Sequence, residues 1–357
     1  MAEPIAWNVA RKTARRAAQL AGARDPFSNS YLGDGFNEQL AELTAEAEPL
    51  VAAITGLRVA TPATALCVDR PGWANVNVES SRRLLAPALE RLAEKTSGPS
   101  AAIGRNVTGA ELGAVLGWMS TRVMGQYDPK LFPGDPTPQD LIYYVTPNVV
   151  SLEKRFAFPP EEFRLWLALH ECTHRAQFVG CSWLGEYFRG LVVQLTDTDS
   201  FDLEVAIKEM RKAIENKRSR SGSQAGSDES HGFGPLSALG GPERKEALDR
   251  IFGLMSLLEG HAEVVMGRAG KYRVPNAERF HRVFAERRKS ARGFARFMQK
   301  VMGMDMKMRQ YEQGAAFVRN VEQHGGEELF AKVWERRENC PTYAEIVKPQ
   351  LWIERVS

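Results

Sequence analysis

The stretch Leu165–Phe178, LWLALHECTHRAQF, places two histidines four residues apart in an otherwise apolar segment. The preceding residues, FPPEEF (Phe158–Phe163), give a proline-led helix start with acidic residues in its first turn. We therefore expect a buried helix over Glu161–Val179, because its apolar residues run nearly all round the helical surface. On such a helix His170 and His174 lie on one face, one turn apart.

Two histidines on one face of a buried helix need a polar partner. Their imidazoles can converge on one ion at the distance of about 2.0–2.1 Å that zinc–nitrogen bonds require. Glu171 lies about 100° round the helix from His170, so its carboxylate can reach a metal-bound water without binding the metal. This is the H-E-x-x-H arrangement of zinc peptidases, with the glutamate as general base. The alternative is a structural histidine pair bonded to carboxylates.

A catalytic zinc site has a third protein ligand and one open position. The segment LLEGHAEVVM (Leu257–Met266) lies on a strongly apolar helical pattern, in which Glu259 and Glu263 share a face. Two carboxylates stacked on a buried face repel each other unless a cation or hydrogen-bond donors lie between them. We expect Glu259 to be the third ligand and Glu263 to orient a ligand histidine. His261 is the alternative ligand, or else a core histidine on the other face.

These residues carry a resemblance to known proteins. HECTH followed far downstream by EGHAE resembles the gluzincin pattern, in which H-E-x-x-H is completed by a glutamate from an E-G-x-A segment. More narrowly, the chain resembles the zincin-like metallopeptidase type 2 family, whose members are often described as associated with coenzyme F-420 biosynthesis. The similar stretches span most of the chain: VLGWMSTRVMGQYDPKLF (Val115–Phe132), YYVTPNVVSLE (Tyr143–Glu153), FRLWLALHECTHRAQF (Phe163–Phe178), LMSLLEGHAEVVM (Leu254–Met266), MDMKMRQYEQGAAFV (Met304–Val318) and PTYAEIVKPQLWIERV (Pro341–Val356).

The resemblance implies a mostly helical zincin-like fold, a zinc ion on His170, His174 and Glu259, and a hydrolase of the metallopeptidase class whose substrates are peptides or proteins. It does not imply a particular substrate. Two departures from the family pattern concern the surroundings of the ligands. Glu263 stands where the family more often has an aspartate, and Gly267–Arg268 stands where an acidic residue is expected.

Helical periodicity dominates the chain and predicts a mainly α protein. Strand signals are few. Leu141–Val150 is rich in β-branched and aromatic residues, and its Pro147 argues for an edge strand near 143–149. Ala63–Asp69 is a weaker candidate. We therefore expect a zincin-like architecture with a small β-sheet. The expected helices are Ile5–Leu20, Asn37–Leu57, Ser81–Glu94, Thr108–Met124, Glu161–Val179, Phe201–Lys217, Glu243–Arg268, Ala277–Lys289, Gly293–Met302, Lys307–Gln323 and Glu327–Arg336.

With 357 residues, the chain is long enough for two lobes. We expect an N-terminal helical lobe at 1–140 and a metal-site lobe at 141–357, unless the two form one continuous domain. Asn216–Gly241 is rich in serine and glycine, and its first half has almost no apolar residues. It is predicted to be a mobile insertion, either a lid over the cleft or a tolerated loop.

As a mechanism, zinc would bring the pKa of its bound water near neutrality. Glu171 would accept a proton from that water and pass it to the leaving amine. The oxyanion needs a second donor, for which Tyr311 and Tyr127 are candidates, each with a core-packing role as the alternative. The strand at 143–149 could hold an extended peptide by strand pairing. The alternative function is a catalytically weak or inactive zincin scaffold, acting as a zinc-stabilised binding protein.

A rival reading comes from residues 271–309, which carry 12 Lys or Arg against 3 Asp or Glu, with interleaved phenylalanines. Such a stretch could bind nucleic acid or an acidic partner. However, Phe280 and Phe284, like Phe294 and Phe297, recur at helical spacing. This pattern favours amphipathic helices whose apolar faces are buried in the core and whose basic faces are exposed to solvent. Nucleic acid is therefore not the expected partner.

Composition adds general expectations. The formal net charge of +3 says little about partners. The four cysteines form no CxxC pair or disulfide framework, so we expect free thiols in a reducing compartment. There is no 18-residue apolar run to span a membrane, and the Arg-rich N-terminus favours a first helix over a signal or transit peptide. A cytoplasmic protein is expected, and its oligomeric state is not predicted.

Overall fold

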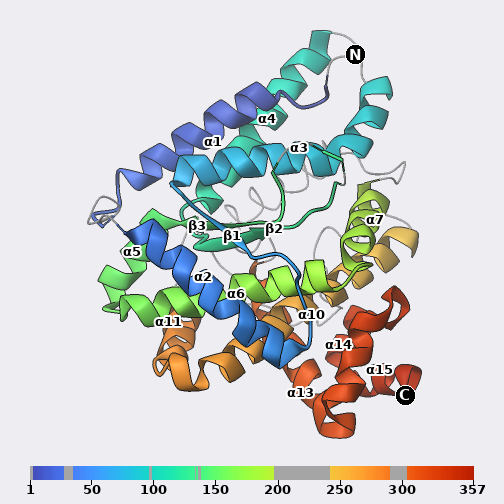
Figure 1. Cartoon of the computed structure of the whole chain (residues 1–357). Helices are drawn as coiled ribbons and strands as arrows, with labels where there is room; N and C mark the ends of the chain where they lie inside the picture. The colour runs from blue at the N-terminus through green and yellow to red at the C-terminus, as the bar shows by residue number, and fades with distance from the viewer. Residues whose placement is uncertain are drawn as a thin grey trace, which may run out of the picture. The chain divides into compact units, whose positions relative to one another are not determined.

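The computed structural model describes residues 3–27, 35–95, 99–132, 134–135, 138–196, 242–289 and 304–357. The chain divides into two compact units. The first consists of Met1–Arg189 with Val265–Arg282, and the second of Gly190–Val264 with Val283–Ser357. Helices dominate both, and a small sheet lies in the first (Figure 1). The expected mainly α fold with a small sheet is confirmed, while the lobe boundary at residue 140 stays a prediction.

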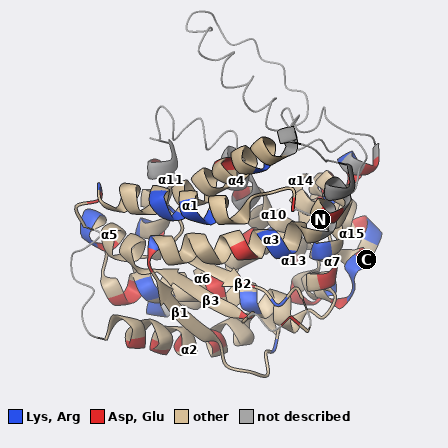
Figure 2. Cartoon of the chain, turned by 90° about the horizontal axis from the view of Figure 1, so that it is seen from above, with Lys and Arg blue, Asp and Glu red and all other residues tan. Residues whose placement is uncertain are grey.

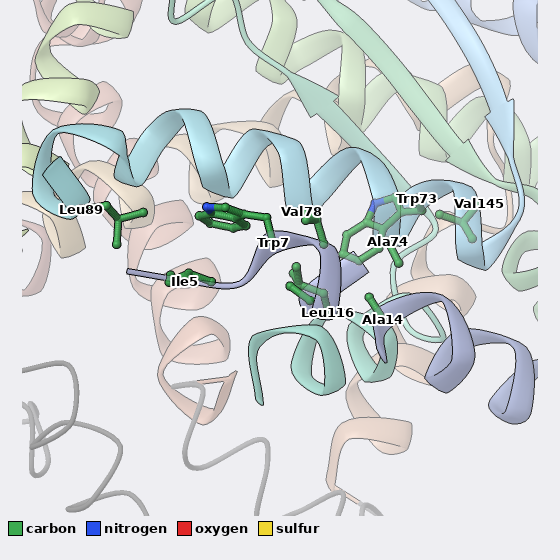
Figure 3. Packing of buried hydrophobic residues seen from close by; sticks show 10 residues of the cluster. Ile5, Trp7, Ala14, Trp73, Ala74, Val78, Leu89, Leu116 and Val145 are labelled. Carbon is green, nitrogen blue, oxygen red and sulfur yellow. The ribbon is translucent and has the colours of Figure 1, made fainter. Parts of the chain in front are cut away.

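The first unit places its sheet between two groups of helices (Figure 1). On one side lie α1 (Trp7–Gly22), α3 (Arg70–Lys95) and α4 (Pro99–Met119), and on the other lie α2 (Phe36–Thr55) and α6 (Pro160–Gly180). A buried apolar cluster joins α1, α3 and α4 to the end of the sheet (Figure 3). Its members include Ile5, Trp7, Trp73, Val78, Leu116 and Val145. Both faces of the sheet are therefore covered.

The sheet has three strands in the order β1-β3-β2. β1 (Thr64–Val68), predicted from Ala63–Asp69, pairs in parallel with β3 (Leu141–Val145). On its other side β3 pairs antiparallel with β2 (Gly125–Asp128), which the sequence pattern did not reveal. Because both sides of β3 are paired, β2 and β1 form the two edges of the sheet within the described residues.

The expectation of an edge strand near 143–149 was therefore wrong. β3 ends at Val145, and helix α5 (Thr146–Phe156) begins at the next residue. Pro147 lies in the first turn of α5, where a residue without an N–H costs no helical hydrogen bond. The proline thus marks a helix start, and it says nothing about the edge of a sheet.

Helices α1 and α4 approach so closely that only glycine fits at their contact. A Cβ atom added at Gly113 would lie 2.3 Å from the carbonyl oxygen of Ala10, and Gly109 and Gly117 meet α1 in the same way. Such spacing is far below ordinary van der Waals contact, so the backbones themselves pack together. This packing fixes the helices that cover one face of the sheet.

The second unit is helical. It contains the first part of α10 (Pro242–Arg273), together with α13 (Met304–Glu335), α14 (Tyr343–Val347) and α15 (Pro349–Val356). α13 is broken at Gly325 and Gly326, whose backbone angles are not helical, so the two helices expected there are separate segments. α10 begins in this unit and ends in the first, followed by α11 (Ala277–Lys289).

Helix α7 (Leu184–Thr196) was not predicted from the sequence. The predicted helices Phe201–Lys217 and Gly293–Met302 and the insertion Asn216–Gly241 lie outside the described residues. All four cysteines are free, as predicted. No helix within the described part of the chain is long and apolar enough to cross a membrane, and the cytoplasmic location stays a prediction.

Asp128, the last residue of β2, generates a testable pH dependence. Its side chain is buried, and this burial raises the pKa of its carboxyl, an effect that Arg83 opposes from 3.9 Å. A carboxyl whose pKa is raised by folding favours the folded state at acid pH, and it loses that contribution as pH rises. We expect Asp128→Asn to unfold a few degrees above wild type at pH 7.5, because the variant buries no charge.

This advantage should shrink as pH falls through 4, because the wild-type carboxyl is then protonated in the folded protein. Thermal unfolding from pH 7.5 to pH 3.5 measures the difference. Arg83 keeps Asp135 at 3.8 Å in the variant, so its charge is not left alone. A stability difference that does not change with pH would contradict the assignment.

Candidate metal centre

Helix α6 carries the two histidines of the H-E-x-x-H motif. It runs from Pro160 to Gly180, with acidic residues in its first turn and buried residues on nearly all sides, as predicted. The Nε2 atoms of His170 and His174 lie 3.2 Å apart. Two nitrogens bound tetrahedrally to zinc at about 2.0–2.1 Å would be separated by about 3.3 Å. The two imidazoles are therefore already spaced to share one ion.

The remaining ring nitrogens have acceptors beside them. Nδ1 of His174 lies 3.0 Å from Oε1 of the fully buried Gln177, and Nδ1 of His170 lies 3.3 Å from Sδ of Met266. An amide oxygen and a thioether accept hydrogen bonds, so the tautomer with its proton on Nδ1 suits both contacts. That tautomer leaves the Nε2 lone pairs available to a shared metal ion.

From the sequence, Glu263 was expected to orient a ligand histidine. In the structure, Gln177 contacts the ring of His174. Gln177 follows His174 by three residues, so helical spacing could have found it. The contact of His170 with Met266 had no local signal, because the two residues are far apart in the chain. The role of Glu263 stays a prediction.

Glu259 completes a candidate ligand set. Among the described residues, one group of three His, Cys, Asp or Glu side chains could hold a metal ion, namely His170, His174 and Glu259. Their ligand atoms all lie within 4.8 Å of one another. Glu259 is buried, and it precedes Met266 on α10 by seven residues, which is two turns along one face. The helix that supplies Glu259 is therefore the one that contacts His170.

Comparison with known proteins shows the family of the chain. The family model of the zincin-like metallopeptidases matches residues 5–353. The chain belongs to the zincin-like metallopeptidase family. A crystal structure from Chloroflexus aurantiacus, described as a candidate hydrolase with a novel fold, is 29% identical, with a TM-score of 0.70 and coverage of 98% of each chain. No curated protein matches the chain.

The glycine of the E-G-x-A segment, Gly260, is required by the packing of α10 against α13. A Cβ atom at Gly260 would lie 2.1 Å from the carbonyl carbon of Gly314 on α13, and one at Gly314 would lie 1.9 Å from the carbonyl oxygen of Ser256. α10 and α13 thus cross with their backbones in contact. A larger residue beside Glu259 would force these helices apart.

His261 takes the position predicted for a core histidine on the other face of α10. Its buried ring packs against Phe330 and Trp334 of α13, with ring centroids 5.3 and 5.0 Å away. It is not part of the ligand group found among the described residues. Metal binding by His261 stays an alternative prediction.

The two tyrosines proposed as oxyanion donors are differently placed. Tyr127 lies on β2, its ring near Phe178, and its hydroxyl donates to Oδ1 of Asp140 at 3.0 Å. Burial, together with the Asp140 carboxylate, raises the pKa of Tyr127 well above its ordinary value. These contacts give Tyr127 a structural role, and a catalytic one stays a prediction. The side chain of Tyr311 lies outside the described part of the structure.

Basic and acidic residues are interspersed over the described helices (Figure 2). Arg273 of the basic stretch 271–309 pairs with Glu46 of α2. Phe280 is fully buried and packs against Phe158 and Trp166, as predicted for a core face. Phe294 and Phe297 lie outside the described residues. Nucleic-acid binding by this stretch stays a prediction.

Arg175, the residue after His174, anchors α6. Its side chain is 2% exposed and donates to Asp140 through Nε and Nη2, at 2.9 Å each. It also donates to Glu48 at 2.7 Å and to the carbonyl oxygen of Thr61 at 2.9 Å. Because Tyr127 donates to the same Asp140, this network ties α6 to β2, α2 and the segment before β1.

We expect Arg175→Lys to destabilise the fold by about 3 kcal/mol, because it loses one or two hydrogen bonds to charged groups, worth about 1.5–3 kcal/mol each. Lysine keeps the charge but cannot make the paired bonds that a guanidinium makes. Urea unfolding measures the change. Arg355→Lys is the matched control, because Arg355 pairs with Glu345 while 39% exposed and should change stability by about 1 kcal/mol or less. Equal losses in the two variants would contradict the anchoring role.

Proposed function

We propose that the chain is a zinc-dependent peptidase, with His170, His174 and Glu259 as metal ligands and Glu171 as general base. One observation carries the proposal. The Nε2 atoms of the two histidines lie 3.2 Å apart, close to the separation of two nitrogens on one zinc ion. A carboxylate oxygen of Glu259 lies within 4.8 Å of both, so the three side chains can share one ion.

The donor set favours zinc. Two imidazoles and one carboxylate are the ligands of one class of catalytic zinc sites, in which the fourth position is left to solvent or substrate. When bound, zinc lowers the pKa of water and polarises a substrate carbonyl. Cys172, which lies between the two histidines in the sequence, is buried, and its thiol donates to the carbonyl oxygen of Thr44. Its thiol is therefore not placed as a fourth ligand.

Glu171 is placed for proton transfer. It is 3% exposed, follows His170 directly, and lies against Gly125 on β2. Its carboxylate therefore lies beside the ligand histidines, on the side of α6 that faces strand β2. There it would accept a proton from the attacking water and pass it to the leaving amine.

Strand β2 supports a peptide as the substrate class. It is an edge strand, and its contact with Glu171 places it beside the proposed base. An extended peptide could add to this edge by backbone hydrogen bonds. This replaces the earlier expectation for the strand at 143–149, because β3 is paired on both sides.

Metal analysis beside peptide digestion tests the proposal. We expect one zinc per chain in wild type and in Glu171→Gln, but no hydrolysis by the variant, a loss of at least about 10²-fold for removal of a general base. His174→Ala should lose the zinc, because it removes a ligand. Zinc is measured by elemental analysis after dialysis, and hydrolysis by mass spectrometry of a mixed peptide library.

His261→Gln is the control for the ligand assignment, and it should keep its zinc while Glu259→Gln loses affinity. Loss of zinc from His261→Gln, with zinc kept in Glu259→Gln, would make His261 the third ligand instead. Equal zinc content in wild type and His174→Ala would contradict the proposed metal site. Stoichiometric zinc without cleavage of any peptide would leave the zinc-stabilised binding protein as the function.

A further inference from the structure

Gly125, the first residue of β2, has no conformational reason to be glycine. The glycines with positive φ are Gly35, Gly56, Gly134 and Gly326, so the backbone at Gly125 is one that any residue adopts. Glycine inside a strand weakens it, and it often marks a place where another group approaches closely. At Gly125 that group is the side chain of Glu171.

The contact is too tight for any side chain. A Cβ atom at Gly125 would lie 2.5 Å from Oε1 of Glu171 and 2.9 Å from both Cδ and Cγ. Ordinary contacts between non-bonded carbon atoms are about 3.5–4.0 Å. The space that a side chain on β2 would fill is therefore the space in which the outer half of Glu171 lies.

Neither side of this contact is free to retreat. β2 is held by β3, where Gly125 pairs with Tyr144 and the amide of Val145 donates to the carbonyl of Met124 at 2.7 Å. Tyr144 is itself fully buried, with its hydroxyl 2.8 Å from Oγ1 of Thr44. On the other side, α6 is anchored through Arg175. A methyl group at residue 125 would therefore move the Glu171 side chain more readily than either backbone.

We propose that Gly125 is a positioning residue for Glu171, whose carboxylate it holds at the reacting position by leaving room for it. Gly125 has this role only if Glu171 is the general base proposed above. The three atoms nearest to the added Cβ all belong to Glu171 and none to a proposed metal ligand. Proton transfer and metal binding should therefore be separable at this position.

The first test is kinetic. In Gly125→Ala the carboxylate must shift by about 1 Å, a misplacement that can cost about 10²-fold in rate. We expect kcat to fall by about that factor, with KM and zinc content close to wild type. Gly190→Ala is the matched control, because a Cβ atom at Gly190 has no neighbour within 4 Å, and it should keep wild-type kcat. Unchanged kcat in Gly125→Ala would overturn the proposal.

The second test needs neither zinc nor turnover. Thermal unfolding of the metal-free protein is measured for Gly125→Ala with Glu171 present and in a Glu171→Ala background. Alanine at residue 171 removes Cγ, Cδ and Oε1, so the added methyl group then has space. We expect Gly125→Ala to lower Tm when Glu171 is present. In the Glu171→Ala background it should leave Tm unchanged or raise it, since alanine restricts the unfolded chain more than glycine does.

An equal fall in Tm in both backgrounds would overturn the role of Gly125. If Gly125→Ala fails to fold, folding of the double variant supports the proposal and its failure overturns it. The two tests also separate this proposal from the proposed function. If the effect of Gly125→Ala on Tm depends on Glu171 but wild type cleaves no peptide, Glu171 is not a general base and Gly125 does not position one. If wild type cleaves peptides but the effect on Tm does not depend on Glu171, only the role of Gly125 is contradicted.

Discussion

Two imidazole nitrogens held 3.2 Å apart on one helix are the constraint on which the candidate metal centre depends. The separation is set by residues four apart on a helix, but its use requires that the helix neither rotates nor slides. Arg175 provides one restraint by binding Asp140, Glu48 and Thr61, which come from different parts of the chain. The contact of 3.0 Å between Nδ1 of His174 and Oε1 of Gln177 provides another, because it restrains the ring itself.

Close backbone approach is the second recurring feature. Gly125 admits Glu171, Gly260 admits α13, and Gly113 admits α1. In none of these cases is a positive φ required. At each of these positions the missing side chain makes room for the neighbouring group. A substitution should therefore displace the neighbouring element more than the backbone at the glycine itself. Two of the three lie beside residues of the candidate metal centre.

Periodicity and motif spacing predicted α6, α10 and the histidine pair, and the family resemblance added Glu259, which lies with them in one candidate ligand group. These signals are local, because apolar residues and ligands repeat at the helical period. β2 could not be found in this way. In Gly-Gln-Tyr-Asp only the tyrosine favours a strand, while glycine and aspartate disfavour one, and the segment is a strand through its pairing with β3. The contact of Met266 with His170 was equally out of reach, because it joins residues that only the tertiary fold brings together.

The sides of α6 explain why one helix can carry both chemistry and structure. At about 100° per residue, His170, His174 and Gln177 fall on one side, and this side faces the proposed ion. Glu171 and Phe178 fall on the next, which faces β2 through Gly125 and Tyr127. Cys172 lies beyond, against α2. The base is therefore adjacent to the ligands but on the face that the sheet edge constrains, so its position depends on the strand that would also hold the peptide.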